Sequence, residues 1–331
     1  MKRTLFLLTI IAVALSACAP LTESFDATSS STPDSGYAQD ASPTVTPQPD
    51  PIPFDPAQDK PAPVSSELIP ADEANTYWVV NPSSGSRLFV QAFYPRGWSG
   101  ELVPALVLVP GGTGTIEPRK AEVLATNGFL IIVFDPEGRG RSEGTEDYNG
   151  FIGQDGLAAV IEAATALPGL DANRYGLVSF SYGVTMSTGA LARYPGLPID
   201  FYIDWEGPVN RIYTTSGCDA PRADGIRWMP CSDDSWWAER EALAFIADVQ
   251  VPYQRIQSQE DHVQSQNTHA IEIVNAAVAA GLPWVRLNEY PANQTYDAAN
   301  PPAMLPNNMD KKLEQTVAAY AWYIIQNVLA K

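Results

Sequence analysis

A serine in the stretch YGLVSFSYGVTMS (Tyr175–Ser187) has the surroundings expected of a catalytic nucleophile. Ser181 ends an apolar run typical of a buried strand and begins a segment typical of a helix, with Gly183 two residues later. A serine at the apex of a strand–turn–helix unit is held clear of the sheet, and small neighbours let strand and helix approach closely. The usual motif, G-x-S-x-G, has glycine where this chain has Ser179, a slightly larger residue that we expect to be tolerated.

Such a serine needs a base to take its proton, and the chain has two histidines, His262 and His269. In one interpretation His262 is the base and Glu206, of DWEGP, is the acid that orients it, which keeps the chain order Ser, acid, His. In a second, His269 reaches inward from the start of a helix. In a third, hydrolysis has been lost and a binding pocket remains. In the remaining interpretation neither histidine takes part in catalysis. His262 is then only the neighbour of the loop carboxylate Asp261, and His269 faces solvent.

A glycine-rich turn, VLVPGGTGT (Val107–Thr115), follows another strand-like run. Such a turn lets backbone N–H groups point into a site, where they can stabilise an oxyanion. Gly112 is the first candidate donor and Thr113 the second, joined by the N–H of Tyr182. The alternative, a phosphate-binding loop, lacks the Walker lysine.

The elements that position these residues follow a regular pattern. Residues 77–95 predict an antiparallel hairpin around a Pro-Ser-Ser-Gly turn. After it, short apolar runs alternate with helix-length segments, which predicts an α/β fold: a mostly parallel sheet with helices on both faces. Ligands of such sheets bind at the carboxyl ends of the strands. The expected strands span 105–110, 129–135, 174–181, 199–206, 251–258 and 284–290, and the expected helices 117–128, 154–169, 182–195, 235–249, 268–281 and 309–330.

Three of these segments together resemble the α/β-hydrolase superfamily, most closely its dienelactone-hydrolase-like and dipeptidyl-peptidase-like branches. They are GFLIIVFDPEGRGRSEG, the Pro-Gly-Gly turn and LPGLDANRYGLVSFSYG, and the resemblance is clear from Ala105 to Gly183 and loose elsewhere. It implies an eight-stranded hydrolase sheet, Ser181 as nucleophile, and hydrolysis of esters or amides without a cofactor or metal. Asp135 and the loop Arg139–Arg141 would then be structural, the alternative being a solvated charged turn.

The resemblance also implies an acid in SQEDHVQ, where an Asp-x-Val pattern points to Asp261. The family's base histidine should follow the last strand. That region of this chain reads LNEYPANQTYDAANPP, with Asn293 near the expected place and no histidine after His269. The chain departs from the family at this point.

The first residues, MKRTLFLLTIIAVALSACAP, predict export. A charged start, a short apolar core and small residues at the cut are typical of a signal peptide, here residues 1–17. Leu-Ser-Ala-Cys resembles the bacterial lipobox, which implies that Cys18 is lipidated and anchors the protein to a membrane, the outer one if the organism is Gram-negative and sorts by Ala19. The alternative is an ordinary secretory signal with a chance cysteine.

Residues 18–74 are expected to be a disordered tether, because the part from Thr22 to about Pro70 is rich in Ser, Thr, Pro and Asp and poor in aromatic residues. Residues 75–331 then form one hydrolase domain. The formal net charge of −18 argues against nucleic acid as a partner, which requires a basic surface. The partners we expect are a small-molecule ester or peptide and the membrane.

Residues 208–235 form a long connection that we expect to be a small lid over the site. It contains Cys218 and Cys231, for which export favours a disulfide over free thiols. Three tryptophans in or beside this segment could line an apolar pocket or pack the lid onto the body: Trp228, Trp236 and Trp237.

Overall fold

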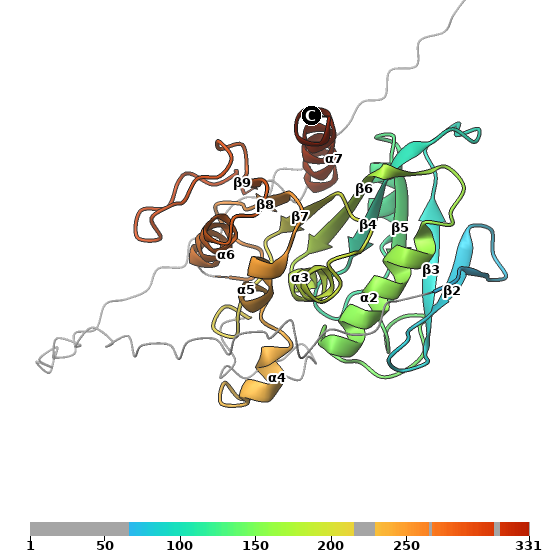
Figure 1. The fold of residues 1–331 in the computed structure, drawn as a ribbon, viewed down its shortest axis with the longest axis horizontal. Coiled ribbons are helices and arrows are strands. Elements are labelled where there is room, and N and C mark those ends of the chain that lie inside the picture. The colour runs from blue at the N-terminus through green and yellow to red at the C-terminus, as the bar shows by residue number, and fades with distance from the viewer. Residues whose placement is uncertain (1–65, 215–228, 265–266, 308–311, 331) are drawn as a thin grey trace, which may run out of the picture. The chain divides into compact units, whose positions relative to one another are not determined.

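The computed structural model describes residues 66–214, 229–264, 267–307 and 312–330, and its core is one nine-stranded sheet with the order β1-β2-β3-β5-β4-β6-β7-β8-β9 (Figure 1). The first three strands and β5 are joined by antiparallel pairs, and the pairs from β5 to β9 are all parallel. The strands are β1 (Ile69–Pro70), β2 (Thr76–Val80), β3 (Arg87–Phe93), β4 (Val103–Val109), β5 (Leu130–Phe134), β6 (Leu170–Phe180), β7 (Phe201–Trp205), β8 (Tyr253–Ile256) and β9 (Val285–Leu287).

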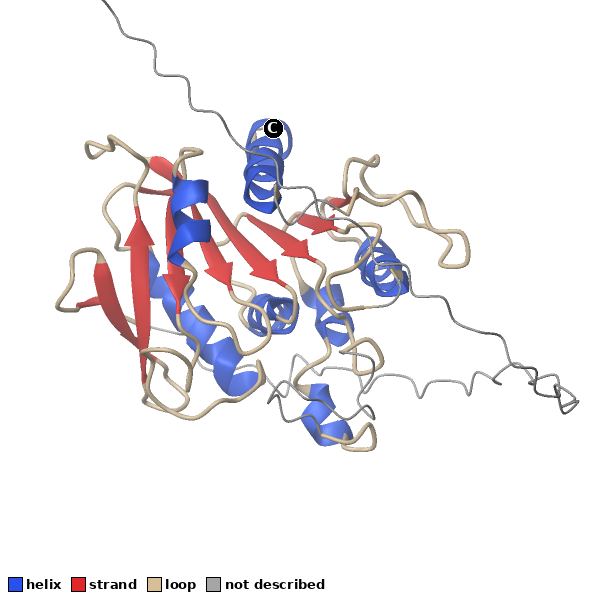
Figure 2. Cartoon of the chain, turned by 180° about the vertical axis from the view of Figure 1, so that it is seen from behind, coloured by secondary structure: helices blue, strands red, loops and turns tan. Residues whose placement is uncertain are grey.

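Helices cover both faces of this sheet, as the views from front and back show (Figures 1 and 2). On one face, α2 (Phe151–Ala164), α3 (Gly183–Arg193) and α6 (Thr268–Ala279) pack on the apolar side chains of the strands. On the other, α1 (Pro118–Ala125) and α7 (Leu313–Ile324), which runs on into a π-helical turn at Ile325–Leu329, enclose a second core. Because both faces are covered, the residues of β5 and β7 are all buried, which explains the uninterrupted apolar sequence of β5; in β7 one buried charge, Asp204, is paired with Arg255.

The antiparallel hairpin and the mostly parallel sheet are confirmed, with two differences. The sheet has nine strands rather than eight, because Ile69 and Pro70 add a short edge strand to β2. This strand lies inside the segment expected to be tether, so the folded domain begins before Ile69 and not at Asn75. Residues 1–65, including the expected signal peptide and Cys18, lie outside the described residues.

The helix expected over 235–249 is instead three short pieces: α4 (Asp234–Ala238), α5 (Ala242–Phe245) and a 3₁₀ turn at Ile246–Asp248. The break falls at two charged residues whose side chains are buried. Arg240 pairs with Asp147 at 2.7 Å, and Glu241 pairs with Arg211 at 2.9 Å. A buried charge is costly without a partner, so these ion pairs override the helical pattern.

The expected lid is described only at its two ends, since residues 215–228, with Cys218 and Trp228, lie outside the described residues. Its predicted disulfide therefore stays a prediction. Trp237 is fully buried and donates a hydrogen bond to the carbonyl of Pro230 at 3.0 Å. Trp236 packs edge-to-face on it and stacks on Arg240. The full burial of Trp237 leaves it no exposed surface with which to line an open pocket.

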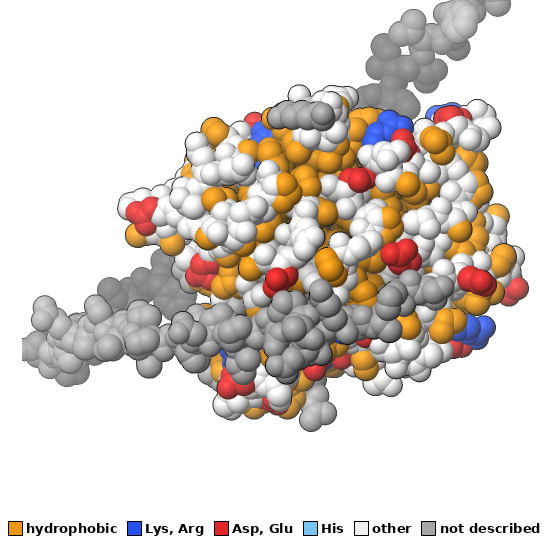
Figure 3. All heavy atoms as spheres, in the orientation of Figure 1, with side chains coloured by type: hydrophobic (Ala, Val, Ile, Leu, Met, Phe, Trp, Pro, Cys, Tyr) orange, Lys and Arg blue, Asp and Glu red, His pale blue; other side chains and the backbone are white. Residues whose placement is uncertain are grey.

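The surface in Figure 3 carries acidic side chains scattered among apolar and uncharged ones, and its described basic side chains do not gather into a patch. This agrees with the net charge of −18. Among the described residues, no helix combines the length and the apolar character that crossing a membrane requires.

Candidate active site

Ser181 occupies a sharp turn between β6 and α3, with a φ of 51°. A non-glycine residue in this left-handed region is strained, and such strain is typical of functional positions. The turn is held by the Ser181 N–H, which donates to the carbonyl of Trp205 at 2.8 Å. Close packing explains the glycine two residues on, because a Cβ on Gly183 would lie 2.8 Å from the carbonyl oxygen of Pro110. The structure thus forms the strand–turn–helix unit expected from the sequence.

Ser179, at the position where the usual motif has glycine, is fully buried. Its hydroxyl hydrogen-bonds with the hydroxyl of Tyr202 at 2.6 Å, on the neighbouring strand β7. A buried hydroxyl is tolerated when it has a partner, and Tyr202 supplies one.

His262 lies directly against Ser181, with Nε2 2.8 Å from the serine Oγ. Its other ring nitrogen, Nδ1, is 2.9 Å from Oε2 of Glu206, so serine, imidazole and carboxylate form a continuous chain. The indole of Trp205 stacks on the imidazole with ring centroids 4.5 Å apart, which fixes the plane of the ring. Of the histidine interpretations, this is the arrangement that the first one requires.

Glu206 is buried immediately after β7, and its backbone also has a positive φ, 49°. Its carboxylate accepts hydrogen bonds from the backbone N–H of His262 at 3.1 Å, from the N–H of Ser258 at 2.9 Å and from the hydroxyl of Ser258. These contacts fix the carboxylate in front of the imidazole. Ser258, which the sequence interpretation did not single out, lies just beyond the end of β8, where the strand-end rule could have found it.

Asp261 places a second carboxylate at the same imidazole, with Oδ1 3.3 Å from Nδ1 of His262. Burial alone would raise the pKa of Asp261, but hydrogen bonds from His262, His269, the backbone of Gln264 and the side chain of Gln257 outweigh it and hold that pKa well below its usual range. Burial likewise opposes the charged form of His262. The hydrogen bonds and charges of Asp261 and Glu206 prevail and raise the pKa of His262 to about 9.

His269 reaches inward from the start of a helix, as the second interpretation expects, but it contacts Asp261 rather than Ser181. It is fully buried at the start of α6, so it does not face solvent. Its Nε2 lies 3.2 Å from Oδ2 of Asp261, and its Nδ1 lies 3.2 Å from Arg255 and 3.1 Å from the carbonyl of Gly207. These contacts place it behind Asp261 rather than at Ser181.

The glycine-rich turn after β4 passes beside the serine. A Cβ on Gly111 would lie 2.7 Å from Cβ of Ser181, so the two backbones are in contact there. Gly112 follows with a φ of 52° and is half-buried, whereas Thr113 is exposed. The turn therefore lies beside the serine, where an oxyanion-binding loop would need to be.

Support for the serine turn comes from residues of the Asp135–Asn149 segment. Arg139 is buried, pairs with Glu146 at 2.5 Å and donates to Asn149 at 2.8 Å. Asn149 in turn donates to the carbonyl of Tyr182 at 2.7 Å. The carboxylate of Asp135 accepts from the backbone N–H groups of Ile116 and Arg141, each at 2.8 Å. Asp135 and Arg139 thus have the structural role expected, whereas the side chain of Arg141 is exposed and pairs with Glu73 at 3.0 Å.

The segment after the last strand, where the family's histidine was expected, has a structural role here. Asn293 binds β9 through its side chain and backbone, at 2.8 and 2.7 Å from Val285. Further on, the backbone of Leu305 pairs with Gln257 at 3.1 Å and with Gln259 at 2.7 Å. This segment therefore supports the loop that carries His262.

Glu206, Asp261 and His262 also offer three ligand atoms within 4.8 Å of one another, and together could hold a divalent cation. Such an ion would take the place of the hydrogen bond at Nδ1. The contact of Nε2 with Ser181 favours proton transfer over metal binding at this site.

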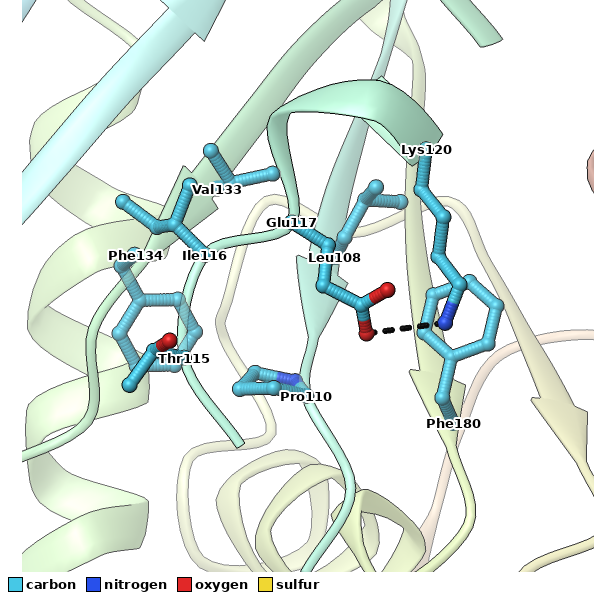
Figure 4. A pocket seen from close by; sticks show the side chains of 9 residues that line it. All are labelled: Leu108, Pro110, Thr115, Ile116, Glu117, Lys120, Val133, Phe134 and Phe180. Carbon is cyan, nitrogen blue, oxygen red and sulfur yellow. Dashed lines mark hydrogen bonds and ion pairs between the residues drawn. The ribbon is translucent and has the colours of Figure 1, made fainter. Parts of the chain in front are cut away.

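A small cavity of about 20 Å³ lies next to the serine turn, on the α1 face of the sheet (Figure 4). It is lined by Phe180 and Pro110, the chain neighbours of Ser181 and Gly111, and by the Lys120–Glu117 ion pair at 2.9 Å. This volume corresponds to about one water molecule, so the cavity does not accommodate an acyl chain as it stands.

Comparison with known proteins identifies the fold. No family model and no curated protein sequence matches the chain. Among solved structures, it is similar to dipeptidyl peptidase 4 of Porphyromonas gingivalis (TM-score 0.56, 18% identity, 75% of this chain and 35% of that chain). It is also similar to Est1E of Butyrivibrio proteoclasticus, solved with ferulic acid bound (TM-score 0.53, 15% identity, 73% of this chain and 97% of that chain). A third similar structure is the acylaminoacyl peptidase of Pyrococcus horikoshii (TM-score 0.53, 16% identity, 72% of this chain and 39% of that chain). The chain thus spans little more than a third of the length of the two peptidases and nearly all of Est1E.

Proposed function

We propose that this chain, which has the α/β-hydrolase fold, is a serine hydrolase that cleaves carboxylic esters, with peptides as the second substrate class. The observation that carries the proposal is the chain of contacts from Ser181 through His262 to Glu206, with distances of 2.8 and 2.9 Å. These are the contacts that an activated serine, its base and the base's orienting acid require. The similar solved structures, two peptidases and Est1E, support the same class of reaction.

In the proposed reaction, Ser181 Oγ attacks the ester carbonyl carbon while its proton passes to Nε2 of His262. Glu206 keeps the hydrogen on Nδ1 and stabilises the imidazolium. The N–H groups of Gly112 and Tyr182 donate to the oxyanion. Collapse of the intermediate breaks the bond to the alcohol, which leaves with the proton from His262. Water then attacks the acyl-serine and gives its proton to His262, which passes it to Ser181 Oγ as the acid is released.

Esters are proposed first because of the basicity of His262. An amine leaving group must be protonated as it departs, and an imidazolium with a pKa of about 9 is a weak acid for that step. The alcohol of an ester depends less on protonation by the imidazolium as it leaves.

The alternative of a catalytically silent binding protein rested on the missing histidine after the last strand. His262 supplies an imidazole at Ser181 from another loop, which favours the hydrolase. We further propose that the protein is exported and anchored to a membrane through lipidated Cys18. This part rests on the sequence of residues 1–18 alone.

Hydrolysis of p-nitrophenyl acetate tests the proposed chemistry. The wild-type protein should release p-nitrophenol, Ser181→Ala should abolish it, and a chelator should leave the rate unchanged because no metal takes part. Loss of activity on chelation, restored by a divalent cation, would instead support a metal site at Glu206, Asp261 and His262.

A further inference from the structure

Two carboxylates, from the ends of two different strands, lie at the same nitrogen of His262. Glu206 follows β7 and places Oε2 2.9 Å from Nδ1, while Asp261 follows β8 and places Oδ1 3.3 Å from it. A single Nδ1–H can be shared between two such acceptors, and either alone can hold it. Building on the proposed function, we propose that His262 has two orienting acids and that His269 is the positioning residue that holds the second one.

Besides His262, four groups lie around the carboxylate of Asp261 and restrict its movement. Its side chain is fully buried, and Oδ1 accepts from the backbone N–H groups of Val263 at 2.9 Å and Gln264 at 2.8 Å. Its other oxygen, Oδ2, accepts from the side chain of Gln257 at 3.0 Å and lies 3.2 Å from Nε2 of His269. A carboxylate with this many donors remains ionised and has little freedom to turn.

The protonation of His269 follows from its other neighbour. Nη2 of Arg255 lies 3.2 Å from His269 Nδ1, and a guanidinium has donors only. Nδ1 must then be the acceptor, so the hydrogen of a neutral imidazole is on Nε2, the ring atom that lies 3.2 Å from Oδ2 of Asp261. The nearby carbonyl of Gly207 accepts from Nη1 of Arg255 at 3.0 Å, so it does not require a hydrogen on Nδ1.

The guanidinium is itself anchored. Arg255 is fully buried on β8, pairs with Asp204 of β7 and donates to Gln257 at 2.7 Å. A row of contacts thus runs from Asp204 through Arg255 and His269 to Asp261 and ends at His262.

The charged and titratable groups that face this row come from each element around it. Glu206 and Asp261 face His262, from the ends of β7 and β8. Tyr213 lies beside His269, with ring centroids 5.4 Å apart, and its hydroxyl donates to Glu272 of α6 at 2.5 Å. The hydroxyl of Tyr253, on β8, donates to Asp204 at 3.1 Å. Among these charged and titratable groups, only Glu206 and Asp261 contact the imidazole of His262. We therefore expect only these two carboxylates to shift the pKa of His262 strongly.

Kinetics of p-nitrophenyl acetate hydrolysis by Glu206→Gln, Asp261→Asn and the double variant test the two-acid arrangement. Each single variant should lose on the order of 10-fold in kcat/KM. The double variant should lose about 10⁴-fold, the loss seen when a triad's only acid becomes an amide. In each single variant the rise of activity with pH should move to lower pH, because the imidazole keeps one carboxylate. A full loss in Glu206→Gln alone, with Asp261→Asn unchanged, would overturn the proposal.

The role of His269 is tested in the Glu206→Gln background, where Asp261 is the remaining acid. Adding His269→Leu should lower kcat/KM by at least a further 10-fold, whereas His269→Gln, which retains a donor toward Asp261, should restore most of it. Thermal unfolding of each variant separates this effect from loss of the fold. Equal activity of the Leu and Gln variants, with equal unfolding temperatures, would contradict the positioning role. If the wild type is active and Ser181→Ala is not, such results overturn this inference and leave the proposed function standing.

Discussion

Ser181 and His262 are separated by 81 residues in the chain, yet the serine Oγ lies 2.8 Å from the histidine Nε2. The contact depends on the parallel order of β6, β7 and β8, whose carboxyl ends carry Ser181, Glu206 and the loop of His262. In a hydrolase whose histidine follows the last strand, that loop would carry the acid alone. Here the carboxylate of Asp261 and the imidazole of His262 come from adjacent positions, and the carboxylate of Glu206 comes from the end of the neighbouring strand β7.

The contact between the glycine-rich turn and the serine predicts that Gly111→Ala inactivates the enzyme. The new Cβ would lie 2.6 Å from the carbonyl oxygen of Phe180 and 2.7 Å from Cβ of Ser181, so the turn must move. A displacement of about 1 Å at a reacting group can cost about 100-fold in rate. We expect kcat/KM for p-nitrophenyl acetate to fall by at least that factor.

Gly196→Ala is the matched control for this substitution. A Cβ at Gly196 meets nothing within 4 Å, and the residue does not have a positive φ. Its activity and unfolding temperature should equal those of the wild type. If Gly111→Ala were as active as this control, the turn would not be part of the site.

The raised pKa of His262 predicts that activity is highest at alkaline pH. The imidazole must be neutral to accept the serine proton, so activity is present above the pKa of His262 and is lost as the pH falls below it. With that pKa at about 9, kcat/KM should still be rising between pH 7 and 9. A pH–rate profile with a substrate that does not titrate in this range checks this. A plateau already reached at neutral pH would contradict the assignment.

Some features of this fold can be predicted from the sequence alone, and others cannot. The apolar runs predict the sheet, and the residues around Ser181 predict the strand–turn–helix unit, because both leave local patterns. The break at Arg240 and Glu241 could not be predicted, since it depends on ion pairs with Asp147 and Arg211, remote in the chain.

The histidine and the carboxylates around Ser181 are harder to predict from the sequence. Glu206 is a candidate because it follows a strand, Asp261 through the family resemblance and His262 as one of two histidines. Only their arrangement in space shows that both carboxylates reach one nitrogen. His269 was misplaced for the same reason. Its partners Arg255 and Asp261 come from the neighbouring strand and its loop, and no periodicity in the sequence reports such a pairing.

The proposed anchor predicts that Cys18→Ala abolishes lipidation. The variant should either appear in the soluble fraction or accumulate with its signal peptide uncleaved, because cysteine is the residue modified at a lipobox. Fractionation and mass measurement of the mature protein check this. A variant that stays membrane-bound and is processed normally would show that Cys18 is not the anchor.

Export also predicts a disulfide between Cys218 and Cys231, because the compartment outside the cytoplasm is oxidising. Non-reducing peptide mapping of freshly prepared exported protein should find the two peptides joined. Two thiols that alkylate without prior reduction would refute the pairing.

The most direct test of the account is labelling by a fluorophosphonate probe, which reacts with a serine activated by a base beside an oxyanion site. The wild-type protein should be labelled on the peptide that contains Ser181, and labelling should be lost in both Ser181→Ala and His262→Ala. His269→Gln, which leaves the base in place, should still be labelled. Undiminished labelling of His262→Ala, or no labelling of a correctly folded wild-type protein, would contradict the central claim that His262 activates Ser181.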